Sequence, residues 1–331
     1  MSKDSVLIVT GQDEFSATRI LHHLDKMGQV YFRFDDGSMV KNQTKISLRL
    51  NNSSFDGIIE LQSGESVQLA SIKSVWFRRP NKLSAMGLYE DGVVRQFVED
   101  EFSSTLRSLY TNLEQVFWMN HPVSARHMLE HNKLLQLKIA ASAGLITPDT
   151  IITNNPVELI GFCEKHGGFL AVKALQSQIF KNADGSATGI YTNKISVDYL
   201  KNRKKAIAVV PLMAQEYVEK KLELRVTVVG KKVLACAIHS QDSERTRHDW
   251  RRYDFAKVKH EAYELPPDIQ LRLLVFMESC NLSFGAIDMI LTPEDKYVFL
   301  EVNPSGQFGW IEDLTGLPIS ESIAETLANC V

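Results

Sequence analysis

The sequence predicts an α/β protein made of more than one lobe, and three observations lead to this prediction. The chain has 331 residues, 44% of them hydrophobic, which is enough to form two or three separate cores. Short apolar segments alternate with longer amphipathic ones in its first third, as in small α/β units. The last third is instead rich in apolar strands, two of which carry acidic residues.

The first part of the chain is expected to form an N-terminal domain over residues 1–120. Its short β-branched and aromatic runs predict strands, and its amphipathic segments predict helices. The strands are expected at 6–10, 30–34, 46–50, 57–61, 74–77 and 117–120, and the helices at 15–27 and 90–113.

A second region is expected over 121–218 and a third over 219–331. The second should begin with a helix over 124–143, ended by Gly144, and should contain a loop with two glycines over 176–189. Its other elements are expected as strands at 150–153, 169–174 and 208–217 and helices at 156–166 and 197–202. The third should hold strands at 224–229, 232–239, 284–292 and 299–303, and a closing helix at 319–328.

Bulk properties exclude several classes of protein. The net charge of −3 gives no sign of a nucleic-acid partner. No apolar run approaches the roughly 18 residues that a membrane span requires. Four cysteines lie far apart, without metal-binding spacing, so we expect reduced thiols in a cytoplasmic protein.

Two acidic residues are predicted to face each other on the last two strands. Glu301 and Asn303 are two residues apart and therefore share a strand face. If Pro293–Lys296 forms a tight turn with two central residues, Asp288 lies opposite Glu301. Facing carboxylates are unfavourable without a partner, and with an amide oxygen they suit Mg²⁺. The alternative is a solvated hairpin, which strands this apolar do not favour.

Two lysines are candidates for binding phosphate. Lys173 interrupts an apolar strand, where a lysine needs a partner, and the glycine-containing loop that follows could surround phosphate with backbone amides. Lys133, in the predicted helix 124–143, has a surface position as its simplest explanation.

The segment after the strand 208–217 could bind an adenine through its backbone, and the next strand carries an acid and an arginine on one face. Glu223 and Arg225 could equally form a surface ion pair, which contributes little. The residues concerned are Gln215, Glu216, Tyr217, Val218, Glu223 and Arg225.

The densest group of charges lies at 244–254. Basic and aromatic residues interleaved in this way could bind nucleic acid, but a local site for phosphate or carboxylate suits a chain that is acidic overall. A solvated loop is the third possibility. The candidates are Arg245, Arg247, His248, Asp249, Trp250, Arg251 and Arg252.

Taken in order from Lys133 to Asn303, these residues resemble the ATP-grasp superfamily. The resemblance implies ATP phosphates on Lys133 and Lys173, adenine at Glu216 and the Val218 backbone, and ribose at Glu223. It also implies Mg²⁺ on Asp288, Glu301 and Asn303, nucleotide contact by Gln215, Tyr217 and Met289, and the transferred phosphoryl group on Arg225. The first 120 residues would be the family's pre-grasp domain.

Three further segments resemble the microviridin and graspetide ligases, which cyclise ribosomally made peptides. They are 30–35, 75–80 and 246–251. The resemblance implies a homodimer that activates Asp or Glu side chains of a precursor peptide, with a leader and an acidic core, and joins them to Ser, Thr or Lys side chains. Arg225, Arg251 and Lys173 would be catalytic, and the cluster at 245–252 would hold the core. A ligase that adds free glutamate is the alternative enzyme, and a non-catalytic nucleotide-binding regulator is an alternative of another class.

Overall fold

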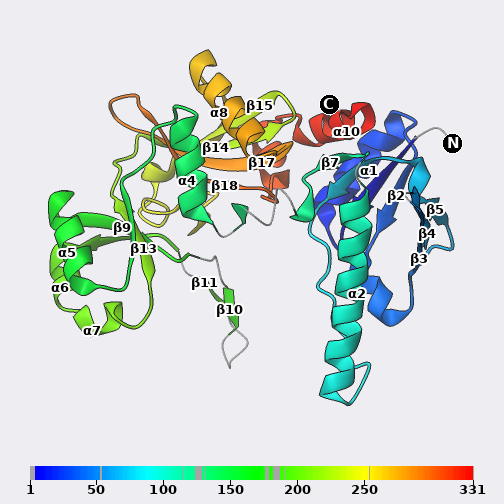
Figure 1. Cartoon of the computed structure of the whole chain (residues 1–331). Helices are drawn as coiled ribbons and strands as arrows, with labels where there is room; N and C mark the ends of the chain where they lie inside the picture. The colour runs from blue at the N-terminus through cyan, green and yellow to red at the C-terminus, as the bar shows by residue number, and fades with distance from the viewer. Residues whose placement is uncertain are drawn as a thin grey trace.

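The structure is a computed structural model that describes residues 4–330, apart from 53, 114, 124–128, 131, 176–178, 182–186, 190 and 253. Figure 1 shows an N-terminal α/β unit on one side and two further sheets on the other, with helix α10 returning to the N-terminal unit. In the described part of the chain, no helix combines the length and apolar character needed to cross a membrane.

The N-terminal unit is built on a parallel sheet of order β2-β1-β6-β7. Val6 and Ile8 of β1 pack with helix α1, and Leu7 and Val9 pack with helix α2, because alternate side chains face opposite sides. A separate antiparallel sheet, β3-β4-β5, extends the second face, and its last strand was not predicted. The elements are β1 Ser5–Val9, α1 Phe15–Lys26, β2 Tyr31–Phe34, η1 Asp36–Lys41, β3 Lys45–Asn51, β4 Ser54–Glu60, β5 Ser66–Gln68, η2 Leu69–Ser71, β6 Ile72–Phe77, α2 Gly92–Asn112 and β7 Phe117–Met119.

A second sheet has the order β12-β9-β13-β8, and its pairings are antiparallel. Helices α5, α6 and α7 lie together beside this sheet (Figure 1). The predicted loop 176–189 is partly wrong, because its described backbone pairs as the hairpin β10–β11. The elements are β8 Thr150–Thr153, α5 Pro156–Lys165, β9 Phe169–Lys173, β10 Ile179–Lys181, β11 Ala187–Gly189, β12 Asn193–Ser196, α6 Val197–Lys201, α7 Lys204–Ile207 and β13 Leu212–Glu216.

The third sheet has five strands in the order β16-β15-β14-β17-β18. Helices α4 and α8 cover one face, where their side chains share a core with Val226 and Ile287. Helix α8 was not predicted. The elements are α4 Lys133–Ser142, β14 Leu222–Val229, β15 Lys232–Ile238, η4 Ser240–Asp242, η5 Trp250–Arg252, β16 His260–Tyr263, α8 Pro267–Ser279, β17 Phe284–Leu291, β18 Tyr297–Asn303, α9 Gly309–Thr315 and α10 Ile319–Asn329.

Helix α4 is shorter than predicted. It begins at Lys133 because Asn132 caps it, its Oδ1 accepting a hydrogen bond from the Leu135 amide at 3.3 Å. The start of the predicted helix, 124–128, lies outside the described residues. Helix α4 precedes the second sheet in sequence but packs on the third, beside β18. Lys133 is therefore carried to the strand that holds Glu301.

The pairing of Asp288 with Glu301 is confirmed, although the turn is not the predicted one. The Thr292 amide donates to the Lys296 carbonyl at 2.9 Å, so three residues form the turn, and Asp295 adopts a left-handed φ of 57°. A β-bulge between Asp288 and Met289 then restores the register. The two departures cancel, and the acids face each other as expected.

Arg78 joins the N-terminal unit to the turn that follows β18. This buried side chain donates from Nη1 to the carbonyls of Ser305 at 2.8 Å and Gly306 at 2.9 Å. Its guanidinium also lies over the rings of Trp76 and Phe308, at 5.7 and 5.4 Å. The N-terminal unit is thereby fixed beside the end of the acid-bearing strand.

Candidate active site

A pocket lies between the second and third sheets and is partly open to solvent. One end is formed by β9, β13 and the segment that leads into β14. The candidate nucleotide residues at this end are Lys173, Gln215, Glu216, Tyr217, Val218 and Glu223.

The other end of the pocket brings together the acids of the hairpin and the loop before η5. Glu223, Arg225 and Asp288 face this side of the third sheet, whereas Leu224 and Val226, on the opposite face of β14, pack under the helices. The candidate residues at this end are His248, Asp249, Trp250, Arg251, Asp288 and Glu301.

Met289 is not part of the pocket wall, so its assignment as a nucleotide contact is wrong. Its side chain is 1% exposed and belongs to the core under the helices. Neighbours on a strand face opposite sides, so Ile290 lines the pocket instead. Leu300, which is the extra residue of β18 at the β-bulge, also lines it. These two apolar side chains were missed by the sequence analysis.

The side chains of Glu216 and Gln215 already form hydrogen bonds with residues beside and within β8 of the second sheet. Glu216 Oε1 accepts from the Asp149 amide at 3.1 Å, and Gln215 Nε2 donates to Thr150 Oγ1 at 3.0 Å. His166 Nδ1 lies 3.6 Å from the other oxygen of Glu216. These bonds hold β13 and the segment after it in place along the pocket.

Lys220 is a pocket residue that the sequence analysis missed. Its Nζ donates to Glu223 Oε1 at 2.8 Å and to the His248 carbonyl at 3.0 Å. Burial raises the pKa of Glu223, and the Lys220 ammonium opposes that rise. The signal was available, because a buried acid needs a cation within reach and Lys220 precedes Glu223 by three residues.

Each of the facing acids is paired with a cation. Arg225 Nη1 lies 2.9 Å from Asp288 Oδ1, and Lys133 Nζ lies 2.8 Å from Glu301 Oε2. Burial would raise the pKa of Glu301, but Lys133 and Arg251 outweigh it and lower that pKa. For Asp288, burial prevails over Arg225 and raises the pKa.

Lys173 lies near the same charged side chains, and its pKa is lower than the usual value for a lysine. Burial lowers its pKa to about 8, with Lys133 and Arg251 adding to the effect and Glu301 opposing it. A phosphate group would give this ammonium the partner that the apolar strand lacks.

The donor set of the hairpin fits Mg²⁺. Within the described residues, no three His, Cys, Asp or Glu side chains gather as a metal site, but Mg²⁺ takes few protein ligands and completes its shell with phosphate and water. Asp288 and Glu301 each have lone pairs beyond the one that their hydrogen-bonded cation occupies. Asn303 follows on the same strand face; it is exposed, and its Oδ1 accepts from the Ser305 amide at 2.9 Å.

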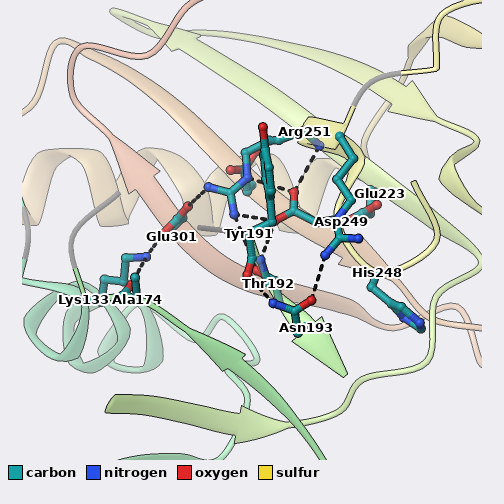
Figure 2. A network of polar contacts seen from close by, with 12 residues as sticks. Lys133, Ala174, Tyr191, Thr192, Asn193, Glu223, His248, Asp249, Arg251 and Glu301 are labelled. Atoms are coloured by element: carbon teal, nitrogen blue, oxygen red, sulfur yellow. Dashed lines mark hydrogen bonds and ion pairs between the residues drawn. The ribbon is translucent and has the colours of Figure 1, made fainter. Parts of the chain in front are cut away.

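The basic residues at 245–252 do not all line the pocket. Arg251 lines the pocket, and its guanidinium forms two bonds with Asp249 (Figure 2). Arg245 is exposed, Arg247 pairs with exposed Glu244, and Arg252 bonds Asn193; none of these three lines the pocket. The cluster therefore does not line the pocket as a whole, and its role in holding an acidic core peptide stays a prediction.

The aromatic members of the cluster support neighbouring groups. Trp250 is buried beneath Arg225, whose guanidinium lies 5.7 Å from its ring. His248 Nδ1 lies 3.0 Å from the Tyr217 hydroxyl. Burial lowers the pKa of His248, helped by nearby cations, and raises the pKa of Tyr217 to about 12.

Two protein-family models match nearly the whole chain. A RimK-like ATP-grasp domain matches residues 130–327, and an MvdD pre-ATP grasp domain matches residues 5–126. The chain belongs to the RimK-like ATP-grasp family. The resemblance to ATP-grasp enzymes is thus confirmed, the first part of the chain is a pre-ATP-grasp domain, and the protein is an ADP-forming ligase. The domain boundaries at 120 and 218 stay predictions.

Solved structures of an ATP-grasp ligase and of two macrocyclases are similar to this chain over nearly its whole length. A Chryseobacterium gregarium RiPP-associated ATP-grasp ligase, solved with ADP and a leader and core peptide, is 31% identical, with a TM-score of 0.88 over 100% of this chain and 98% of that one. The macrocyclase MdnC of Microcystis aeruginosa MRC, solved with precursor peptide MdnA, is 29% identical, with a TM-score of 0.84 over 99% and 100%.

The macrocyclase MdnB of the same organism is 28% identical, with a TM-score of 0.77 over 98% of each chain. No curated protein matches this chain.

Proposed function

We propose that this ligase uses ATP to cyclise a ribosomally made precursor peptide, joining Asp or Glu side chains to Ser, Thr or Lys side chains. The observation that carries the proposal is the pocket itself. It places the candidate nucleotide residues beside two facing carboxylates and the guanidinium of Arg251. The chain is 29% identical in sequence to MdnC, which was solved with a precursor peptide, and 31% identical to the Chryseobacterium ligase.

The reaction would proceed in two steps. A substrate carboxylate oxygen attacks the γ-phosphorus of ATP, giving an acyl phosphate and ADP. A hydroxyl or amine of the same peptide then attacks the acyl carbon, the acyl–oxygen bond breaks, and phosphate leaves as the nucleophile loses its proton. Catalysis of this kind rests on positioning and on stabilising charge.

Lys133 and Lys173 would hold the ATP phosphates. Both ammonium groups lie near Glu301, so nucleotide binding would exchange a carboxylate partner for a phosphate one. When bound on Asp288, Glu301 and Asn303, Mg²⁺ would supply positive charge to the transferring phosphoryl group.

Arg225 and Arg251 would act on the acyl group rather than on the nucleotide. Arg225 bonds to Asp288 and also donates to the Gln307 carbonyl at 3.3 Å. Arg251 directs Nη1 toward Glu301 Oε1, 3.9 Å away. Both could stabilise negative oxygen where the acyl phosphate forms and breaks down.

The proposed partner is a precursor peptide with a leader and an acidic core, bound by a cytoplasmic homodimer. The described cysteines are all free, and three of them are buried, which suits a reducing compartment. Light scattering of the purified protein would test the dimer by giving its mass.

The proposal is tested by what drives ATP consumption. Short acidic peptides encoded in reading frames beside the gene would be supplied one at a time with ATP and Mg²⁺. We expect ADP and phosphate release only with a peptide that is cyclised. Release driven by free glutamate instead would contradict the proposal and favour an amino-acid-adding ligase.

A further inference from the structure

The carboxylate of Asp249 has no lone pair left for a substrate. Oδ1 accepts from the Arg251 amide at 3.0 Å and from Arg251 Nε at 2.8 Å. Oδ2 accepts from Arg251 Nη2 at 2.7 Å and from the Thr192 amide at 2.8 Å. A carboxylate offers about four lone-pair sites, so the four bonds fill it, and Asp249 is only 3% exposed.

This arrangement argues against two other roles for Asp249. A general base must have a free lone pair close to the proton that it removes, and a metal ligand needs a free oxygen as well. The hydrogen bonds from Arg251 also lower the pKa of Asp249 despite the opposing effect of burial. The bonding of Asp249 therefore favours neither of these two roles, and its place among the substrate contacts stays a prediction.

The same bonds decide which edge of the Arg251 guanidinium is free. Its Nε and Nη2 edge is held by Asp249, and Nη2 also lies 3.5 Å from Thr192 Oγ1. Nη1 remains, and it faces Glu301 in the pocket (Figure 2). A planar guanidinium that is held along one edge presents its remaining N–H donors in one direction.

Asp249 also connects the two parts of the chain that carry the second and the third sheet. Thr192 lies directly before β12 of the second sheet, whereas Asp249 belongs to the loop that follows β15 of the third. A parallel contact joins the same segments, because Arg252 Nη2 donates to Asn193 Oδ1 at 2.7 Å. Thr192, Asp249 and Arg251 line the pocket, and Asn193 does not.

We propose that Asp249 is a positioning residue that acts through Arg251: it locks the guanidinium along one edge and thereby directs Nη1 at the place where the acyl phosphate forms. The inference rests on the proposed function, since it assigns Arg251 to the acyl group. It predicts that Asp249 contributes to turnover only while Arg251 is present.

A double-mutant cycle tests this dependence with the precursor peptide identified by ADP release. Asp249→Asn should lower kcat by roughly a hundredfold. The asparagine side chain has a single acceptor oxygen, and its NH₂ group would face an N–H donor of Arg251 or Thr192. In the Arg251→Lys background, Asp249→Asn should lower kcat by less than about a further threefold. Equal losses in both backgrounds would overturn the proposal.

A readout that needs no peptide comes from the Arg251 Nε–H signal in nitrogen-resolved NMR, assigned by its absence in Arg251→Lys. We expect this proton to exchange slowly in the wild type and to be lost to fast exchange in Asp249→Asn. Unchanged protection would contradict the proposal. Because this arm uses free enzyme, it separates failure of the positioning role from failure of the cyclisation itself.

Asn193→Ala is the matched control. It removes the parallel contact between the lobes without touching Arg251, so kcat should stay within about twofold of the wild type. A loss as large as that of Asp249→Asn would show that lobe contact, not the direction of Arg251, is what matters. Affinity for ADP should be unchanged in both variants and confirms that each one is folded.

Discussion

At the residue scale, the site consists of buried charges that neutralise one another. Lys133, Arg225 and Arg251 lie against Glu301 and Asp288, at distances from 2.8 to 3.9 Å. Removing one member of such a group leaves its partner buried without compensation, which costs more than the pair contributes. Substrates would therefore bind by exchanging partners with these groups, so binding should depend on their protonation.

Nucleotide affinity should fall at alkaline pH because of Lys173. Its pKa is lowered to about 8, so the ammonium form dominates below pH 8 and the neutral amine above it. If the charge is needed, affinity for ADP should drop by up to about tenfold per pH unit above 8. Calorimetric titration from pH 7 to 9.5 measures this. Lys173→Arg keeps its charge and should flatten the profile; a profile that is flat in the wild type would remove Lys173 from the phosphate site.

Glu301→Gln should keep nucleotide binding but lose most turnover, by roughly a hundredfold or more, because one of the two facing carboxylates is gone. The measurement is phosphate release as Mg²⁺ is varied, in which higher Mg²⁺ should restore only part of the rate. Glu294→Gln, on the exposed turn of the same hairpin, is the control and should behave like the wild type. Normal rates in Glu301→Gln at ordinary Mg²⁺ would refute the metal assignment.

At the element scale, the sequence predicted most strands of the site but not the details that orient their side chains. Alternation placed Glu223 and Arg225 on one face of β14, and Glu301 and Asn303 on one face of β18. Applied to Met289, the same rule would have excluded it. The bulge beside Asp288 left no sequence signal, because bulges are decided by packing across the sheet. The true start of α4 could have been predicted from Asn132, which is a favourable N-cap.

The turn after β18 should not tolerate a side chain at Gly306. A Cβ there would lie 2.3 Å from Ala286 Cβ and 2.7 Å from Arg225 Nη2. Gly306→Ala should therefore lower the melting temperature and displace Arg225, with a loss of turnover that exceeds any loss of ADP affinity. Gly161→Ala, in helix α5 with open space around it, is the control and should be neutral or stabilising by up to about 1 kcal/mol. Equal behaviour of the two variants would contradict the close packing of this turn.

At the scale of the whole molecule, the ends of the chain meet. Helix α10 packs on α1 of the N-terminal unit (Figure 1), and Ile319, Ile323 and Leu327 are fully buried there. The sequence predicted the amphipathic helix but not its partner, because the apolar stripe of a helix does not specify which surface covers it. The association of α4 with the third sheet is a similar case, set by tertiary contacts between distant segments.

Ile323→Ala should destabilise the protein by roughly 2–5 kcal/mol, the usual cost of a cavity left by a buried isoleucine. Thermal or denaturant unfolding measures the change. Val157→Ala, on helix α5 where the side chain is 74% exposed, is the control and should change stability by less than about 0.5 kcal/mol. Equal stability of the two variants would show that α10 does not hold the N-terminal unit in place.

The central claim is most directly tested by the mass of the precursor peptide after incubation with the enzyme, ATP and Mg²⁺. The proposed chemistry removes one water for each link and releases one phosphate each time. We therefore expect the peptide to lose whole multiples of the mass of water, matched by phosphate released; ester links would reopen in mild base, whereas amide links would survive. A gain in mass that corresponds to added glutamate, or ATP consumption with no change in the peptide, would contradict the account.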